Sequence, residues 1–242
     1  MNLSLIAPAS GFVPDALAHH FLPDPEPAIA DIQRFRGRIY AQDSAIPLSA
    51  LDSLGRHRSE VDYRSWHIVA RDAQGQISGV LRLPIYPIDT PIESLLLNQT
   101  LERMQPEQRH LYRYVLQRFI DRSVTAGYPC VAEPGGWAVD RTRCGRQTGI
   151  NLVTTGWAIG EYYGHYVAAS TVTVKHHAAD LLKLMGGFNE LAGTPNARFH
   201  DPYFRCDIEL VFFYSDKVSG RFGEMVEKIK EDLLKSQSFV TL

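Results

Sequence analysis

The sequence has little of what marks a secreted, membrane or nucleic-acid-binding protein. It has three cysteines, an odd number, and they are far apart in a chain of 242 residues. That usage argues against a disulfide framework, and no pair has metal-ligand spacing, so we expect a reducing compartment and no metal. The first residues lack the basic and apolar regions of a signal peptide. No apolar run approaches the ~18 residues of a membrane helix. We therefore expect a cytoplasmic protein with no membrane span.

The chain also lacks a large excess of positive or negative charge. The formal net charge is −2, and the Lys and Arg residues are scattered along the chain. Without a basic patch, nucleic-acid binding is not expected. The hydrophobic fraction of 45% is ordinary for a globular core. Nothing in the sequence indicates the oligomeric state.

The first half of the chain predicts an arm, a helix and a hairpin. Residues 1–26 are proline-rich and have no clear period, which predicts an irregular N-terminal arm before a single domain over 27–242. An apolar stripe at helical spacing predicts a helix over 27–41. Segments at 66–71 and 77–83 flank a Gly-containing turn, so they predict a β-hairpin, and Pro84, Pro87 and Pro91 are expected to end its second strand.

The second half alternates helices and strands. We expect helices within 92–126, a strand over 136–140, a helix over 147–163 and a strand from 166 to 174. A short helix, a strand over 207–214 and a last amphipathic helix complete the order, which is that of an α/β chain. The apolar side chains of 92–126 either wall an acyl tunnel or form an extra packed layer.

One stretch reads as a strand, a tight loop and a helix N-terminus. Gly136 to Asp140 form the strand, and the loop runs from Cys144 to Gly149. Gly145 and Gly149 would permit positive φ and close approach of the backbone, and Arg146 adds a positive charge. Free N–H groups at a helix start suit a phosphate or pyrophosphate. The alternative is a plain turn in which the glycines serve only the chain reversal.

The run from Trp137 to Phe188 resembles the core of GCN5-related N-acetyltransferases. In that superfamily a strand ending in Val-Asp, here Val139-Asp140, leads to a loop that holds the pyrophosphate of an acyl carrier. The resemblance implies that the cofactor-binding residues are Val139, Cys144, Gly145, Arg146, Gln147, Thr148 and Gly149. Cys144 and Gln147 depart from the family pattern. Leu182 stands where many members have a Tyr that acts as general acid.

The N-terminal half looks like acyl-homoserine-lactone autoinducer synthases and long-chain N-acyl amino acid synthases. The run from Phe35 to Tyr40, with Asp62 and the segment 79–83, carries this resemblance. Glu133 matches a Glu of those enzymes, whereas their Arg three residues later is Gly136 here. The resemblance implies an α+β fold with a mixed, mostly antiparallel central sheet flanked by helices, split near strand 136–140, and a helical insertion at about 92–126.

It also implies an N-acyltransferase. The acyl group would pass directly from a thioester, acyl-CoA or acyl carrier protein, to a primary amine of a small molecule such as an amino acid. Glu133 is the general-base candidate, because a protonated amine must lose a proton to attack. It could instead be a loop carboxylate before Pro134 that caps another part of the chain. Arg36, Arg82 and Trp137 are the candidates for substrate binding. Arg suits a carboxylate, but Arg36, Asp62 and Arg82 could equally form an ion pair that anchors the helix.

Two other functions stay open at this point. One is acetyl-CoA-dependent N-acetyl transfer. The other is a non-catalytic module that binds acyl-CoA or an acyl carrier, which the departures at Cys144, Gln147 and Leu182 favour.

Overall fold

The chain divides into two units in a computed structural model that describes residues 2–175, 177–190, 198–218, 220–235 and 238–240. The first unit consists of Met1–Pro84, Pro134–Tyr162 and Gly223–Leu242. The second consists of Ile85–Glu133 and Tyr163–Phe222. Each unit has its own strands and covering helices.

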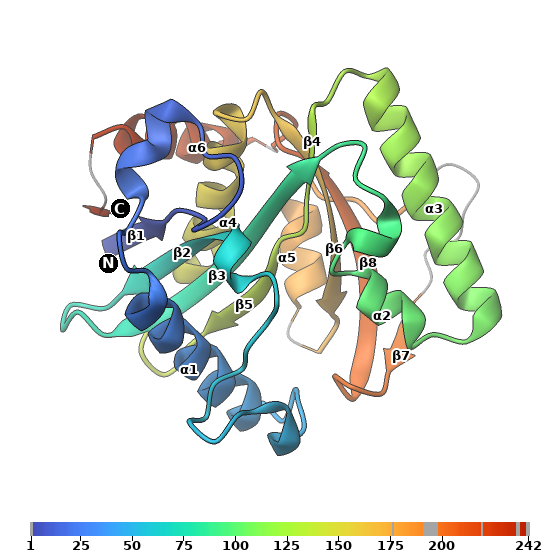
Figure 1. Cartoon of the computed structure of the whole chain (residues 1–242), viewed down its shortest axis with the longest axis horizontal. Coiled ribbons are helices and arrows are strands. Elements are labelled where there is room, and N and C mark those ends of the chain that lie inside the picture. Colours follow the sequence, from blue (N-terminus) through green and yellow to red (C-terminus); the bar gives the residue numbers. More distant parts are fainter. Residues whose placement is uncertain (1, 176, 191–197, 219, 236–237, 241–242) are drawn as a thin grey trace. The chain divides into compact units, whose positions relative to one another are not determined.

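The sheet of the first unit is antiparallel, in the order β9-β1-β2-β3-β5. Its strands are β1 (Asn2–Ile6), β2 (Ser65–Arg71), β3 (Ile77–Pro87), β5 (Gly135–Val139) and β9 (Ser238–Val240). Figure 1 shows β1, β2 and β3 side by side. Of the prolines expected to end this strand, Pro84 does not, because it still pairs with Ser65 of β2, whereas Pro87 is its last residue.

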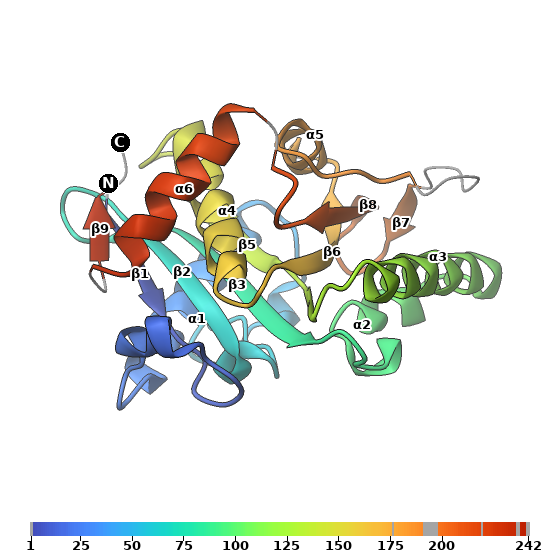
Figure 2. The same cartoon turned by 90° about the horizontal axis from the view of Figure 1, so that it is seen from above.

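Three helices cover this sheet: α1 (Glu26–Gln42) lies on one face, and α4 (Arg146–Glu161) and α6 (Arg221–Leu233) on the other (Figure 2). Successive side chains of β2 and β3 point to opposite faces of the sheet. Val69 and Val80 pack with Phe35 of α1. Ile68 and Leu81 instead lie near Gly156 of α4. Every second residue of β2 and β3 therefore faces α1.

The second unit has a mixed sheet. β4 (Cys130–Ala132) pairs with the end of β3, then β6 (Tyr166–Thr173), β8 (Cys206–Tyr214) and β7 (Phe199–Asp201) follow. The β4–β6 pair is parallel and the others are antiparallel. The helices of this unit are α2 (Asn98–Glu102), α3 (Pro106–Thr125) and α5 (Ala178–Leu184).

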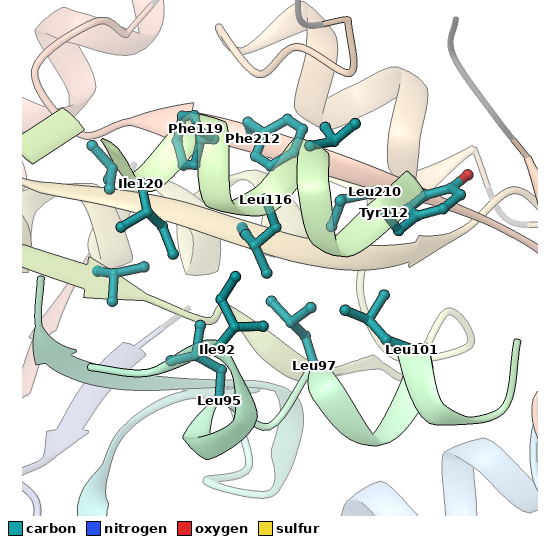
Figure 3. Packing of buried hydrophobic residues seen from close by; sticks show 14 of the residues in the cluster. Ile92, Leu95, Leu97, Leu101, Tyr112, Leu116, Phe119, Ile120, Leu210 and Phe212 are labelled. Atoms are coloured by element: carbon teal, nitrogen blue, oxygen red, sulfur yellow. The ribbon is translucent and has the colours of Figure 1, made fainter. Parts of the chain in front are cut away.

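The buried face of α3 packs onto this sheet as a filled core (Figure 3). The rings of Phe119 and Phe212 lie 4.5 Å apart. The helical segment before α3 contributes Ile92, Leu95, Leu97 and Leu101, all at most 6% exposed. The packing supports the second interpretation of residues 92–126, an extra packed layer.

The architecture agrees with the expected fold class but not with the expected N-terminal arm. The mixed, mostly antiparallel sheet with flanking helices is confirmed, and the helical insertion consists of a short turn at Ile92–Ser94, α2 and α3. The irregular arm over 1–26 is wrong at β1 and at the 3₁₀ helix Asp15–His20. The single domain over 27–242 stays a prediction. None of the described helices is both long and apolar enough to cross a membrane.

Replacing Phe119 by Ala tests this core. Phe119 is 0% exposed, so Phe119→Ala should cost about 3–5 kcal/mol of unfolding free energy, measured by urea titration with circular dichroism. Tyr114→Ala is the matched control, since Tyr114 is on the same helix but 53% exposed. A similar, small loss of unfolding free energy in both variants would contradict a filled core and favour the tunnel interpretation instead.

Candidate functional site

Strand β5 carries a β-bulge. Gly135 pairs with Arg82 and Ala138 with Val80, so Gly136 and Trp137 together face the single residue Leu81. Gly136 has a φ of +60°, the left-handed conformation that a bulge of this kind assigns to Gly. The bulge interrupts the ladder between β5 and β3.

The second edge of β5 is available. In the part of the chain that the structure describes, β5 pairs with β3 alone. Gly135, Gly136 and Trp137 are half-buried. A half-exposed strand edge with a bulge can offer N–H and C=O groups to an extended ligand.

The loop after β5 is held by Asp140. One carboxylate oxygen accepts hydrogen bonds from the Thr142 hydroxyl at 2.6 Å and from the Thr142 N–H at 3.1 Å. The other accepts from Arg38 Nη1 at 3.1 Å. The Thr142 hydroxyl, and after it Arg38, lowers the pKa of Asp140 although burial opposes this. Asp140 is therefore ionised at neutral pH and fixes the turn into α4.

Helix α4 begins at Arg146 without a side-chain cap and without an acidic residue in its first turn. The first N–H groups of a helix have no partner within it and carry a partial positive charge. The side chain of Arg146 lies outside the described residues. The backbone at the start of α4 can bind an anion, whatever the loop side chains do.

Neither of the two loop glycines, Gly145 and Gly149, adopts a positive φ. Gly145 has a φ of −84°, and a Cβ there would meet nothing within 4 Å. Gly149 is helical, and a Cβ on it would lie 3.0 Å from Cζ2 of Trp137. The expected positive φ is wrong at both positions, and Gly149 lets α4 pack on the Trp137 ring.

The remaining predicted cofactor residues are engaged within the first unit. The Cys144 thiol lies 3.1 Å from the Asp140 carbonyl oxygen, and Gln147 donates to Asn151 at 2.8 Å. Thr148 is 3% exposed and packs against Gly79, the partner of Val139. These side chains shape the loop, so the backbone is what remains for ligand binding.

A buried ionic network lies on the α1 face of the sheet. One oxygen of Asp62 accepts from Arg36 at 3.1 Å and from Arg82 at 3.1 Å. The other accepts from Arg36 at 2.9 Å, from Gln33 at 2.8 Å and from the Ser59 N–H at 2.9 Å. Asp62 and Arg36 are 0% exposed and Arg82 is 6% exposed. The ion pair expected between helix and hairpin therefore exists.

Charge and burial set the ionisation of this network. Burial opposes ionisation of Asp62, but Arg36 and then Arg82 outweigh it and hold the pKa of Asp62 well below its usual range. Burial, followed by the charges of Arg36 and Arg82, lowers the pKa of His57 to about 4. His67 binds the Asp62 carbonyl oxygen at 2.7 Å, and burial lowers its pKa to about 4. Both histidines are neutral at pH 7.

Glu133 belongs to the second unit and is 3% exposed. Its two carboxylate oxygens accept hydrogen bonds from the backbone N–H groups of Leu96 and Leu97, each at 2.7 Å. Leu97 is the residue before α2, so Glu133 binds the turn that leads into that helix. The capping role that the sequence left open as the alternative to a base agrees with these bonds, although no spacing identified the two N–H groups.

Trp137, a predicted substrate contact, packs on α4. Its Nε1 atom is buried without a hydrogen-bond partner among the described residues. The bulge at Gly136 was missed by sequence reasoning, although the pair Gly135-Gly136 inside a strand pattern is a bulge signal.

Removing the Asp62 charge should destabilise the first unit. Asp62→Asn leaves Arg36 and Arg82 buried without a counter-charge, which should cost about 3–5 kcal/mol. All three tryptophans lie in the first unit, so their fluorescence during urea unfolding reports its stability. Asp31→Asn breaks an exposed ion pair on α1 and should cost less than about 1 kcal/mol. Equal losses would show that the network contributes no more than a surface pair.

Acid should destabilise the first unit before any carboxylate titrates. His20, His57 and His67 have pKa values lowered from 6.5 to about 4, mainly by burial. The unfolded chain binds these protons first, so stability is lost as pH falls from about 6.5 toward 4, by about 2 kcal/mol per histidine at pH 5. Unfolding followed by tryptophan fluorescence at pH 7 and pH 5 measures this loss.

His20→Gln should reduce the pH dependence by about a third, since one of three such groups is removed. His110→Gln, at an exposed position of α3, is the control. An unchanged pH dependence in His20→Gln would refute the assignment for that residue.

Comparisons with known proteins agree with the fold. FeeM, an N-acyl amino acid synthase from uncultured soil microbes, is 13% identical with a TM-score of 0.54, over 81% of this chain and 89% of that one. TofI, in a ternary complex with an inhibitor and MTA, is 14% identical with a TM-score of 0.52, over 89% and 92%. Arylalkylamine N-acetyltransferase 2 from Aedes aegypti is 12% identical with a TM-score of 0.51, over 78% and 95%.

No protein-family model matches the chain, and no curated protein matches it in sequence. The likeness is therefore one of fold, and it confirms at that level the resemblance to N-acyltransferases of the GCN5-related type.

Proposed function

We propose that the protein is an N-acyltransferase that uses an acyl thioester, on coenzyme A or an acyl carrier protein, to acylate a primary amine of a small molecule such as an amino acid. The proposal rests on one observation, the order in which a strand and a helix of the first unit follow each other along the chain. Among the described residues the bulged strand β5 pairs on one edge only, and the loop 140–145 leads from it to a helix, α4, with no side-chain cap from the same part of the chain. The fold shared with FeeM and TofI supports the same reaction class.

Both features suit a pantetheine thioester. The amide groups of pantetheine can bind the edge of β5 as a further strand would. The phosphates of the carrier can bind the first N–H groups of α4. An N–H group at the bulge, between Gly135 and Ala138, can donate to the oxyanion that forms on the thioester carbonyl.

The reaction is a direct transfer. The neutral amine attacks the thioester carbonyl carbon, so that a C–N bond forms and the carbonyl oxygen becomes an oxyanion. When the oxyanion collapses, the C–S bond breaks and the thiolate leaves. The amine loses its proton to a base, and the thiolate takes up a proton to become the free thiol. No covalent enzyme intermediate is needed.

Glu133 is the proposed base. The backbone N–H groups of Leu96 and Leu97 donate to its two oxygens, and a carboxylate can take up a proton directly or through water. The two backbone bonds hold the carboxylate in one orientation, which favours proton transfer at a fixed atom.

The same bond pair favours a second candidate function. A carboxylate that binds the turn before α2 has a structural purpose without any chemistry, as in a module that binds an acyl carrier and does not turn it over. Donor binding is common to both functions, so turnover discriminates between them.

The wild-type protein should release free thiol and form an amide when it is supplied with acyl donors and amines. The donors are acetyl-, octanoyl- and palmitoyl-CoA and the corresponding acyl carrier proteins, each with a mixture of amino acids and simple amines. Thiol release and product mass are measured together. Donor binding by calorimetry without product from any pair would establish the binding module.

Glu133→Gln should reduce kcat at least about 100-fold with donor affinity retained, since general-base catalysis contributes 10²–10⁴-fold. The new amide must also place an NH2 group against a backbone N–H, so unfolding is measured in parallel. Glu93→Gln is the control, as Glu93 is exposed in the same insertion.

The dependence of kcat on pH separates the roles of Glu133. If Glu133 only holds the turn before α2, Glu133→Gln should lose stability and keep the wild-type pH profile. Loss of the ionisation that limits kcat at low pH supports the base.

A further inference from the structure

The proposed transfer leaves one step without a residue, the protonation of the leaving thiolate. When the C–S bond breaks, the sulfur carries a negative charge and takes up a proton to become the free thiol. Leu182, which stands where the resemblance places a tyrosine acid, has no proton to give. The sulfur is bonded directly to the thioester carbonyl carbon, so the group that protonates it has to lie beside the bulge of β5, where the oxyanion subsite is proposed.

A tyrosine hydroxyl from α1 lies at this bulge. The Tyr40 hydroxyl donates a hydrogen bond to the carbonyl oxygen of Trp137 at 3.4 Å. The Asp140 N–H donates to the Ser78 carbonyl oxygen of β3 at 2.9 Å, and backbone groups along a strand alternate between its two edges. The Trp137 carbonyl, three residues earlier, therefore points to the unpaired edge. The Tyr40 hydroxyl thus lies at the edge of β5 that is proposed to bind the thioester.

This hydroxyl is fixed in place but weakly bonded. The Tyr40 ring packs against the apolar cluster that includes Ala138, and it meets the His57 ring edge-on, with 5.3 Å between the centroids. Tyr40 is half-buried, so it is not sealed off from solvent. Its bond to the Trp137 carbonyl is longer than the about 2.5–3.0 Å of an ordinary O–H···O bond. The proton can therefore turn to a stronger acceptor at the same edge, such as a thiolate.

Positive charge beside Tyr40 favours the loss of this proton. The ionic network holds two positive charges, on Arg36 and Arg82, against the single negative charge of Asp62. His57 adds no charge at pH 7, because its pKa is about 4. Burial, and after it Arg36, lowers the pKa of Arg82, whereas Asp62 and Tyr40 raise it. Arg82 and Tyr40 thus interact electrostatically, and the surplus positive charge would stabilise a tyrosinate.

We propose that Tyr40 is the general acid of the transfer. This inference rests on the proposed function and assigns a residue to one of its steps. As the C–S bond breaks, its electron pair goes to the sulfur, and the phenol proton passes from the Tyr40 oxygen to that sulfur. The products are the free thiol and a tyrosinate. Arg82 stabilises the tyrosinate until it takes up a proton from water, which has received the amine proton from the base.

Tyr40→Phe tests the assignment with the donor and amine that the wild-type protein turns over fastest. It should reduce kcat about 100-fold, the low end of what general acid catalysis contributes, with donor affinity retained in calorimetry. Tyr162→Phe is the matched control, because Tyr162 is also half-buried in the first unit and its hydroxyl donates to the Lys230 carbonyl oxygen at 2.8 Å. Tyr162 follows the last residue of α4, far from its N-terminus. Equal kcat in the two variants would overturn the inference.

A selenium analogue of the donor separates an acid from a merely structural hydroxyl. A selenolate is a much weaker base than a thiolate and leaves without a proton. With selenium in place of the thioester sulfur, the ratio of the wild-type rate to the Tyr40→Phe rate should fall from about 100 to near one. If Tyr40 only holds β5 through Trp137, the variant should be slowed equally with both donors, and such equal slowing would overturn the inference. Unfolding followed by tryptophan fluorescence verifies that the variant folds.

The acylation assay distinguishes failure of this inference from failure of the proposed function. If the wild-type protein forms an amide and Tyr40→Phe forms it at the same rate, only the assignment of Tyr40 is refuted, and N-acyl transfer stands. If the wild-type protein forms no amide from any pair of donor and amine, the transferase itself is refuted, and the assignment of Tyr40 with it.

Discussion

The ion pair between Asp62 and Arg36 is the constraint on which the first unit depends. A carboxylate and a guanidinium that are both 0% exposed must satisfy each other. Asp62 does so by joining three parts of the chain: α1 through Gln33 and Arg36, β3 through Arg82, and its own segment through Ser59. Helix α1 is thereby fixed in rotation, because a turn about its axis would withdraw Arg36 from its partner. The apolar contacts of Phe35 and Ile39 with the sheet then fall into place on the adjoining stripe of the helix.

The two faces of β5 meet their neighbours at unusually short range. On one side, Gly136 lets the guanidinium of Arg36 lie against the backbone, and on the other the Trp137 ring lies against Gly149 of α4. The strand is thus held between a buried cation and the start of a helix, both of which contribute positive potential. Polar and steric requirements converge on the five residues of β5, which also supply the proposed oxyanion subsite.

The sequence was sufficient for the class of fold and for much of the element order, because the apolar run at 207–214 and the amphipathic last helix are strong signals. Strands β4, β7 and β9 were not predicted, since three residues do not establish a period. The pairing of Arg36, Asp62 and Arg82 was an open alternative that spacing alone did not decide. The bonds of Glu133 to the turn before α2 join residues 36 and 37 positions apart in the chain, a relation that no local pattern encodes.

The first unit is assembled from three segments that lie far apart in the chain, and its first strand, β1, pairs with its last, β9. His19 and His20 also bind the carbonyl oxygen of Leu233 at the end of α6, each at 3.0 Å. One edge of β1 can pair with β2 as soon as residues 65–71 are made, but its other edge stays open until β9, at residues 238–240, arrives. Pairing of such distant segments is slow. Until then the open edge can pair with another chain, so closure by β9 also protects the first unit against edge-to-edge association.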